Sequence, residues 1–173
     1  NNLLPYSSMT VAQKQNFDAL TAQIATIRAK SPAITPFGSS SCLGSTGLVP
    51  QQVSGGIPKL GGLYSVEVQD CLPVSIAYHV LGLDTSQWLG LPLPLDLSAL
   101  GGGTGCEIHV SPYQLAPHIT NAIGSATHFV LVPNTPALVG MNVFHQWVAL
   151  DPAAPGNGLG WVTSPPLAAR LGL

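Results

Sequence analysis

The sequence predicts a mainly β protein, an antiparallel β-sandwich of jelly-roll or immunoglobulin-like form, with one amphipathic α-helix at its N-terminus. From residue 63 onward, about eight short apolar segments alternate with turn residues, and no helical pattern lies between them. The 16 prolines and 19 glycines are typical of a turn-dense domain. A length of 173 residues suits a single domain with one core.

The helix is expected over residues 10 to 30. Thr10 and Gln13 fit a capping box, in which the hydroxyl and the amide satisfy free backbone groups at the start of a helix. Four apolar residues follow at spacings of three and four, so they form one stripe: Phe17, Leu20, Ile24 and Ile27. Pro32 makes continuation unfavourable. The stripe must be buried, either on its own domain or on a neighbouring subunit.

We expect residues 1–36 to be an N-terminal extension carrying this helix, and residues 37–173 to be the β-sandwich domain. The segment from residue 31 to residue 62 is rich in Ser, Gly and Pro, which is typical of a linker followed by irregular strands. The later strands are expected near 64–68, 74–81, 106–110, 127–132, 141–150, 159–163 and 167–171. Pro92 and Pro94 remove ladder donors, which confines the 90–97 run to an edge or an extended non-sheet segment.

The composition is poor in charge. Charged residues make up 7% of the chain, whereas a soluble domain usually carries roughly 25%. Such a surface either relies on uncharged polar groups or is covered by neighbouring subunits, as in an assembly. We expect no nucleic-acid partner, because there is no basic cluster, and no membrane span, because every apolar run is interrupted early.

The few charges are unevenly placed. Residues 1–41 carry three basic and one acidic side chain, a net charge of +2, and residues 42–173 carry two basic and six acidic ones, a net charge of −4. Opposite signs favour docking of one segment on the other, within a chain or between chains. With so few charges, the expected contribution is small.

Three cysteines are present, at positions 42, 71 and 106. An odd number cannot pair fully within one chain, so one disulfide and one buried thiol is the simplest arrangement in a secreted protein, and an intermolecular bridge is the alternative. The chain begins with Asn rather than Met, which suggests a processed leader. We therefore expect an extracellular or cell-surface location.

Residues 42–173 resemble a Gly/Pro-rich C-terminal β domain that recurs in large secreted proteins of Planctomycetes and similar bacteria. The matching runs lie in consistent order at 88–97, 105–112, 132–140, 144–151 and 158–164. The resemblance implies a secreted, β-rich module without an assigned catalytic site, usually appended to larger proteins. It also implies a cysteine near the domain start and another in the Gly-Cys run, so Cys42 and Cys106 are the expected disulfide, and Cys71 lies outside the pattern.

No residue set predicts catalysis, a cofactor or a metal centre. A serine nucleophile would need a base and an orienting acid, and no G-x-S-x-G motif is present. Asp84, Asp96 and Asp151 stand at expected strand ends, where Asp usually caps a turn, and a calcium site built from turn carboxylates is the alternative. A metal would need three of the five histidines to converge, so we expect them instead to face solvent or to have their hydrogen bonds satisfied.

These observations support two functional hypotheses. The leading one is a secreted structural subunit that assembles with itself into a fibre, surface layer or matrix. Its docking arm would be the helix stripe, with Leu3 and Leu4 as an apolar segment able to add to a neighbour's sheet edge. The alternative is a monomeric module that binds glycans or anchors to a cell surface, with Trp88, beside a turn, as the exposed aromatic contact.

Overall fold

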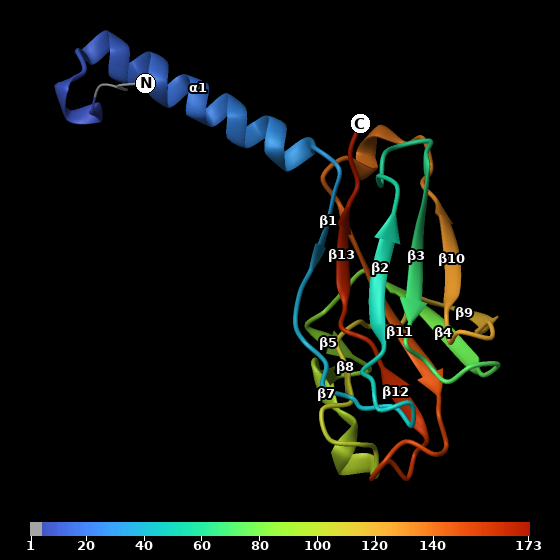
Figure 1. Cartoon of the computed structure of the whole chain (residues 1–173). Helices are drawn as coiled ribbons and strands as arrows, with labels where there is room; N and C mark the ends of the chain where they lie inside the picture. Colours follow the sequence, from blue (N-terminus) through green and yellow to red (C-terminus); the bar gives the residue numbers. More distant parts are fainter. Residues whose placement is uncertain (1–4) are drawn as a thin grey trace.

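The structure is a computed structural model, and it describes residues 5–173. It is mainly β, with one N-terminal helix and several antiparallel sheets that form a sandwich, as the sequence predicts (Figure 1). The helical elements are η1 (Tyr6–Ser8), α1 (Val11–Lys30), η2 (Leu97–Leu100) and η3 (Pro136–Leu138). The first strands are β1 (Ala33–Pro36), β2 (Gln51–Gly55), β3 (Leu63–Gln69) and β4 (Ile76–Gly82).

A cluster of very short strands follows β4: β5 (Gln87–Trp88), β6 (Leu91–Pro92), β7 (Leu95–Asp96) and β8 (Glu107–Ile108). The remaining strands are β9 (Gln114–Ile119), β10 (Ala126–Leu131), β11 (Asn142–Leu150), β12 (Trp161–Thr163) and β13 (Leu167–Arg170). The larger sheet has the order β1-β13-β11-β4-β9, with β12 also paired to β11, and the smaller sheet has the order β10-β3-β2. The pairs β5-β6 and β7-β8 form two further, two-stranded sheets.

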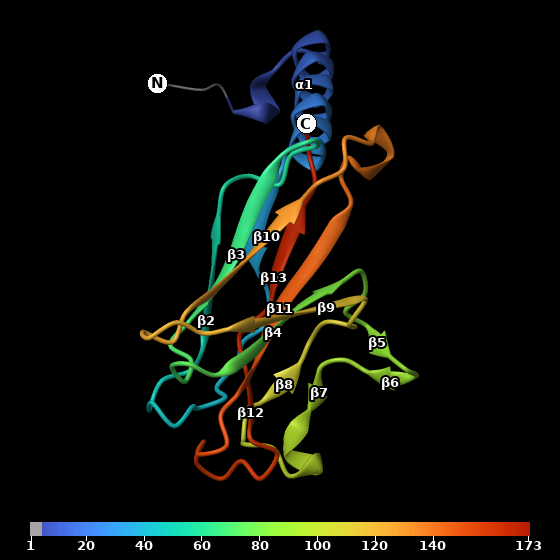
Figure 2. The ribbon, with the colours of Figure 1, turned by 90° about the vertical axis from the view of Figure 1, so that its right-hand side faces the viewer.

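The two sheets pack through alternating side chains. On β3, Tyr64, Val66 and Val68 are buried, as the alternation of this segment predicts. They face the larger sheet, where Trp147 of β11 and Ala77 of β4 are buried. Figure 2 shows β3 and β10 of the smaller sheet beside β13 and the long strand β11 of the larger one. The core of the protein therefore lies in the layer between the sheets.

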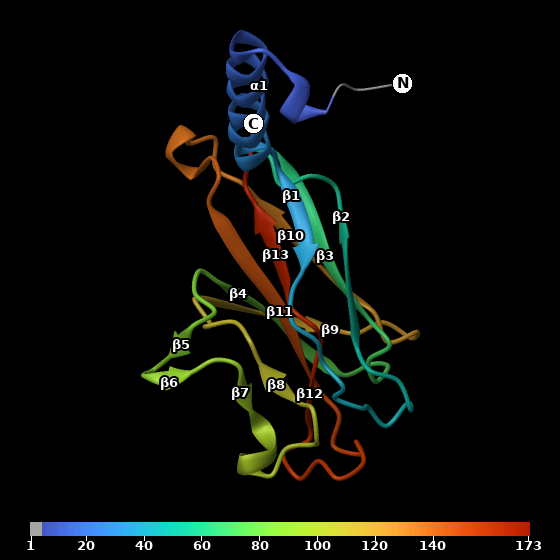
Figure 3. The same cartoon turned by 90° about the vertical axis from the view of Figure 1, so that its left-hand side faces the viewer.

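Helix α1 agrees with its predicted bounds. The Thr10 hydroxyl accepts a hydrogen bond from the backbone nitrogen of Gln13 at 3.3 Å. The backbone nitrogen of Thr10 donates to Gln13 Oε1 at 2.9 Å, so both halves of the capping box form. The helix ends at Lys30, two residues before Pro32. In both side views, α1 stands beyond the upper end of the sheets (Figures 2 and 3).

The structure differs from the expected domain boundary at residue 36. Ala33–Pro36 forms β1 and pairs along its whole length with β13, so this part of the expected extension belongs to the larger sheet. The Ser, Gly and Pro content of the surrounding segment obscures the strand in the sequence. The arm that lies outside the sheets therefore ends near Lys30.

Candidate interaction surfaces

The first candidate surface is the apolar stripe of α1. Its four members are exposed by 48% (Phe17), 56% (Leu20), 41% (Ile24) and 65% (Ile27). Within residues 5–173, no residue of α1 is buried against the sheets. In the structure, the stripe therefore does not pack on its own domain. Leu3 and Leu4, the other expected members of the arm, lie outside the described residues.

The short turn before α1 extends this stripe. Tyr6 packs edge-on against Phe17, with ring centroids 5.6 Å apart, and its hydroxyl donates to the Asp18 carboxylate at 2.9 Å. This hydrogen bond raises the pKa of Tyr6, because it favours the protonated hydroxyl. The Lys14 ammonium lies 5.6 Å from the centre of the same ring. The outer half of the arm thus presents two aromatic rings beside a cation.

The exit of the arm from the domain is packed. Arg170 Nε donates to the Ser31 carbonyl at 3.0 Å, which joins the end of α1 to β13. Gly172 lies so close to Pro32 that a Cβ on this glycine would overlap the proline ring. A Cβ on Gly140 would lie 3.4 Å from the carbonyl oxygen of Ala29. These contacts hold α1 pointing away from the sheets.

The second candidate surface is an apolar groove on the outer face of the larger sheet. Residues 83–113 form an insertion between β4 and β9 that contains β5 to β8 and lies against this face (Figure 3). Between the insertion and the sheet is a groove of about 330 Å³. Its lining is apolar: Tyr78, Val80, Trp88, Leu97, Ile108, Pro112, Leu115, Val148, Leu159 and Trp161.

Trp88, the aromatic residue expected to contact a ligand, lies in this groove. It is half-buried on β5. On the opposite wall the rings of Tyr78 and Trp161 pack with their centroids 5.9 Å apart. The groove therefore gathers three aromatic side chains, but its lining offers almost no hydrogen-bonding group. A sugar needs such groups beside its stacking surface, whereas an apolar side chain needs none.

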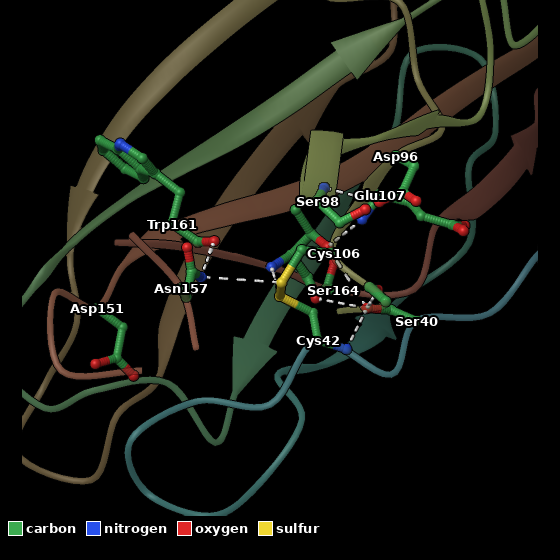
Figure 4. Close-up of a disulfide and its surroundings, with 12 residues drawn as sticks. Ser40, Cys42, Asp96, Ser98, Cys106, Glu107, Asp151, Asn157, Trp161 and Ser164 are labelled. Atoms are coloured by element: carbon green, nitrogen blue, oxygen red, sulfur yellow. Dashed lines mark hydrogen bonds between the residues drawn. A yellow bond between two sulfur atoms is a disulfide. The ribbon is translucent and has the colours of Figure 1, made fainter. Parts of the chain in front are cut away.

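A disulfide fixes the wall of the groove. Cys42 and Cys106 are bonded, as the resemblance implies, and both are buried. Cys106 directly precedes β8, whose Ile108 lines the groove. Nearby, Asn157 Nδ2 donates to the Trp161 carbonyl at 2.7 Å, and the Thr163 nitrogen approaches Cys42 Sγ at 3.2 Å (Figure 4). The bond thus holds the insertion beside β12.

A cluster of histidines occupies the layer between the sheets. His79 Nε2 and His145 Nδ1 are 3.1 Å apart, and the same distance separates His118 Nε2 from His128 Nδ1. The rings of His79 and His128 stack with centroids 4.3 Å apart and join the two pairs. Tyr64 of the opposite sheet contacts His145 Nε2 at 2.8 Å. Sequence reasoning missed this convergence.

Burial keeps the inner histidines neutral. Desolvation, and then the neighbouring histidines, lower the pKa of His79 to about 2, and desolvation chiefly lowers the pKa of His145 to about 4. Both side chains are almost wholly inaccessible to solvent, so neither can reach a substrate. Among residues 5–173, no group of three or more His, Cys, Asp or Glu side chains is arranged to hold a metal ion.

The other candidate groups have structural surroundings. The carboxylate of Asp84 accepts from the Ser86 nitrogen, and that of Asp96 accepts from the Ser98 nitrogen, each at 2.8 Å, which is the turn-capping role expected of them. These hydrogen bonds lower the pKa of both carboxyls. Asp151 is buried and accepts from the Ser45 nitrogen at 2.7 Å. Burial raises the pKa of the Cys71 thiol to about 12, so it is un-ionised at neutral pH.

Two features of these surfaces had a signal in the sequence. His145 and Trp147 alternate on one strand with buried neighbours, so an inward-facing histidine could have been expected. The groove had a weaker signal, because its lining comes from segments far apart along the chain.

In the described part of the chain, none of the helices combines the length and the hydropathy that a membrane-spanning segment needs.

The chain was compared with known proteins in three ways. No protein-family model, no curated protein and no solved structure matches it. The geometry described above is therefore the basis for any functional proposal.

Proposed function

We propose that this protein is a non-catalytic structural subunit that assembles with copies of itself outside the cell, using α1 as its docking arm. The observation that supports this most strongly is the exposure of the whole apolar stripe on a helix held away from its own domain. In proteins, most of the stability of a helix comes from packing one apolar face against other elements rather than from helix propensity. A partner for the stripe is therefore expected.

Two further observations support a structural role. Charged groups make up only 7% of the chain, so little repulsion keeps copies apart. The Cys42–Cys106 bond favours an oxidising compartment, which is consistent with secretion. His79, His145 and the un-ionised Cys71 thiol are buried, so none of these three groups is accessible as an acid, base or nucleophile. We therefore propose an extracellular fibre, layer or matrix as the place of this subunit.

The test is the mass of the full chain in solution as its concentration is raised. We expect the 17.8 kDa chain to form larger species in light scattering, and negative-stain electron microscopy to show ordered assemblies. A Leu20→Gln/Ile24→Gln variant replaces the two central residues of the stripe with a polar residue that still favours a helix. This variant should remain monomeric. An Ala22→Gln/Ala25→Gln variant changes the opposite face and should assemble normally. A wild-type chain that stays monomeric would contradict the proposal.

Glycan binding receives less support from the geometry. Trp88 lies among aromatic residues, but the groove around it lacks the polar partners that orient a sugar. The same groove is better suited to an apolar side chain.

A further inference from the structure

We infer that the stripe of α1 binds in the apolar groove of a second copy of the chain, so that subunits join head to tail. This inference rests on the proposed self-assembly and adds the surface that receives the arm. The groove is the one defined above, between residues 83–113 and the larger sheet, with Trp88 and Trp161 on opposite walls. The mode is that of an apolar helix face in a hydrophobic groove.

The first argument is the match of size and chemistry. A dry apolar cavity of about 150 Å³ holds one benzene-sized group. The groove, at about 330 Å³, therefore has room for two neighbouring side chains of the stripe, such as Leu20 and Ile24. Residues four apart on a helix lie roughly 5–6 Å from each other, which keeps both within one groove. Because both surfaces are apolar, neither requires hydrogen bonds from the other.

The second argument is charge. The insertion that forms one wall, residues 83–113, carries three acidic residues and no Lys or Arg. One of them, Asp96, directly precedes the lining residue Leu97, whereas the Glu107 carboxylate lies 3.0 Å from His109 Nε2. The arm carries Lys14, Arg28 and Lys30 against one acidic residue, Asp18. A basic arm and an acidic insertion attract each other, whereas two basic arms do not.

The third argument concerns which copy supplies the helix. The contacts of Pro32 with Gly172 and of Ser31 with Arg170 hold the arm outward, and folding it back onto its own groove would break them. The groove is lined by residues of β5, β8 and β12, and these strands lie at the lower end of the domain, away from the end that α1 leaves (Figures 1 and 3). A second copy can be reached without any such change. Such a contact uses different surfaces on the two partners, so it extends into filaments unless it closes into a ring.

The decisive experiment mixes two full-length variants. The arm variant, Leu20→Gln/Ile24→Gln, keeps the groove, and the groove variant, Leu115→Gln/Leu159→Gln, keeps the arm. Leu115 and Leu159 are exposed by 55% and 39%, so these substitutions leave the core intact. We expect each variant alone to be monomeric, with association weakened at least tenfold, and an equimolar mixture to give a species of twice the 17.8 kDa chain mass.

Other results would overturn the inference in distinguishable ways. A groove variant that assembles like wild type would show that arms pair with each other or bind elsewhere, which leaves the proposed function standing. Two monomeric variants that do not combine would also refute docking in the groove. A monomeric wild-type chain would refute both proposals. The control is Phe129→Gln/Leu131→Gln on β10, which removes two apolar side chains, exposed by 64% and 72%, outside the groove and should not change assembly.

A second readout needs no groove variant. Two of the three tryptophans, Trp88 and Trp161, line the groove, whereas Trp147 is already buried in the core. We expect the fluorescence of the wild-type chain to shift to shorter wavelength as it assembles, and that of the arm variant to stay constant. Assembly without any such shift would place the arm on another surface.

Discussion

The β domain and the helical arm differ in how their apolar side chains are partnered. In the domain, two sheets enclose Tyr64, Trp147 and their neighbours, and a disulfide ties the insertion to the segment before β2. In the arm, an equally regular helix has a complete capping box but no buried residue. The capping box and the helix pattern therefore define where α1 forms, but no residue of α1 is buried against the domain, where most of a helix's stability usually arises.

The strongest contrast should appear between a core residue and a stripe residue. Trp147 is 1% exposed and Ile27 is 65% exposed. We expect Trp147→Ala to lower the free energy of unfolding by about 3–5 kcal/mol, because it leaves a large cavity between the sheets. Ile27→Ala should change it by less than about 0.5 kcal/mol in urea titrations of dilute protein. A comparable loss from both would mean that α1 packs on its own domain.

The disulfide should contribute almost as much as Trp147 to the unfolding free energy of the domain, and nothing to the stability of the arm. Its cysteines are separated by 64 residues, so breaking it frees a large loop in the unfolded chain. We expect Cys42→Ala/Cys106→Ala to lose about 3–4 kcal/mol of unfolding free energy. Reduction of the wild-type protein should give the same loss, and Cys71→Ala, which keeps the bond, is the control. If the insertion positions the groove, the reduced protein should also assemble less well.

The histidine layer makes the domain, but not the arm, sensitive to acid. His79 and His145 have pKa values of about 2 and about 4 in the fold, below the usual value of 6.5. Below pH 6.5 the unfolded chain therefore binds protons that the folded chain does not, and stability falls with falling pH. For these two residues, the unfolding free energy should drop by about 2 kcal/mol between pH 6.5 and 5.5.

This pH effect can be measured by urea titration at several pH values. A His145→Gln variant should show a smaller slope over the same range, because one titrating group is gone. A flat profile in the wild-type protein would mean that the histidines are accessible to protons in the folded state. Far-UV circular dichroism of α1 should not follow the same pH dependence, since no histidine lies within residues 11–30.

The sequence predicts those parts of the fold whose signal lies in a few neighbouring residues. Thr10, Gln13 and Pro32 act within one turn of the helix, so its bounds follow from the sequence. The alternation of β3 and β11 likewise identifies their buried faces. Strand β9 was missed because it contains Pro117, which is tolerated since β9 is an edge strand paired only with β4. Strands β1 and β2 lie among Gly, Ser and Pro residues that favour a loop prediction.

The two candidate surfaces also differ in how local their signal in the sequence is. The stripe of α1 is a local pattern and was predicted, whereas its packing partner could not be. The groove brings residue 78 to residue 161 and depends on the path of the insertion, which no periodicity encodes. Trp88 was identified from its place beside a turn, but its apolar surroundings come from strands far away in the chain. The resemblance to secreted bacterial β domains stays a prediction, as do the location and the assembly.

The smallest effect should be confined to the arm. Thr10→Ala removes the hydroxyl that accepts from the Gln13 nitrogen, so the start of α1 should lose about 1 kcal/mol of local stability. Hydrogen exchange should become faster at the amides of the first turns, while the urea midpoint of the β domain stays unchanged. Thr26→Ala is the control, because its hydroxyl donates to the Ala22 carbonyl inside the helix and caps nothing. If α1 docks in a neighbour's groove, the faster exchange should disappear as the protein is concentrated, since docking stabilises the whole helix.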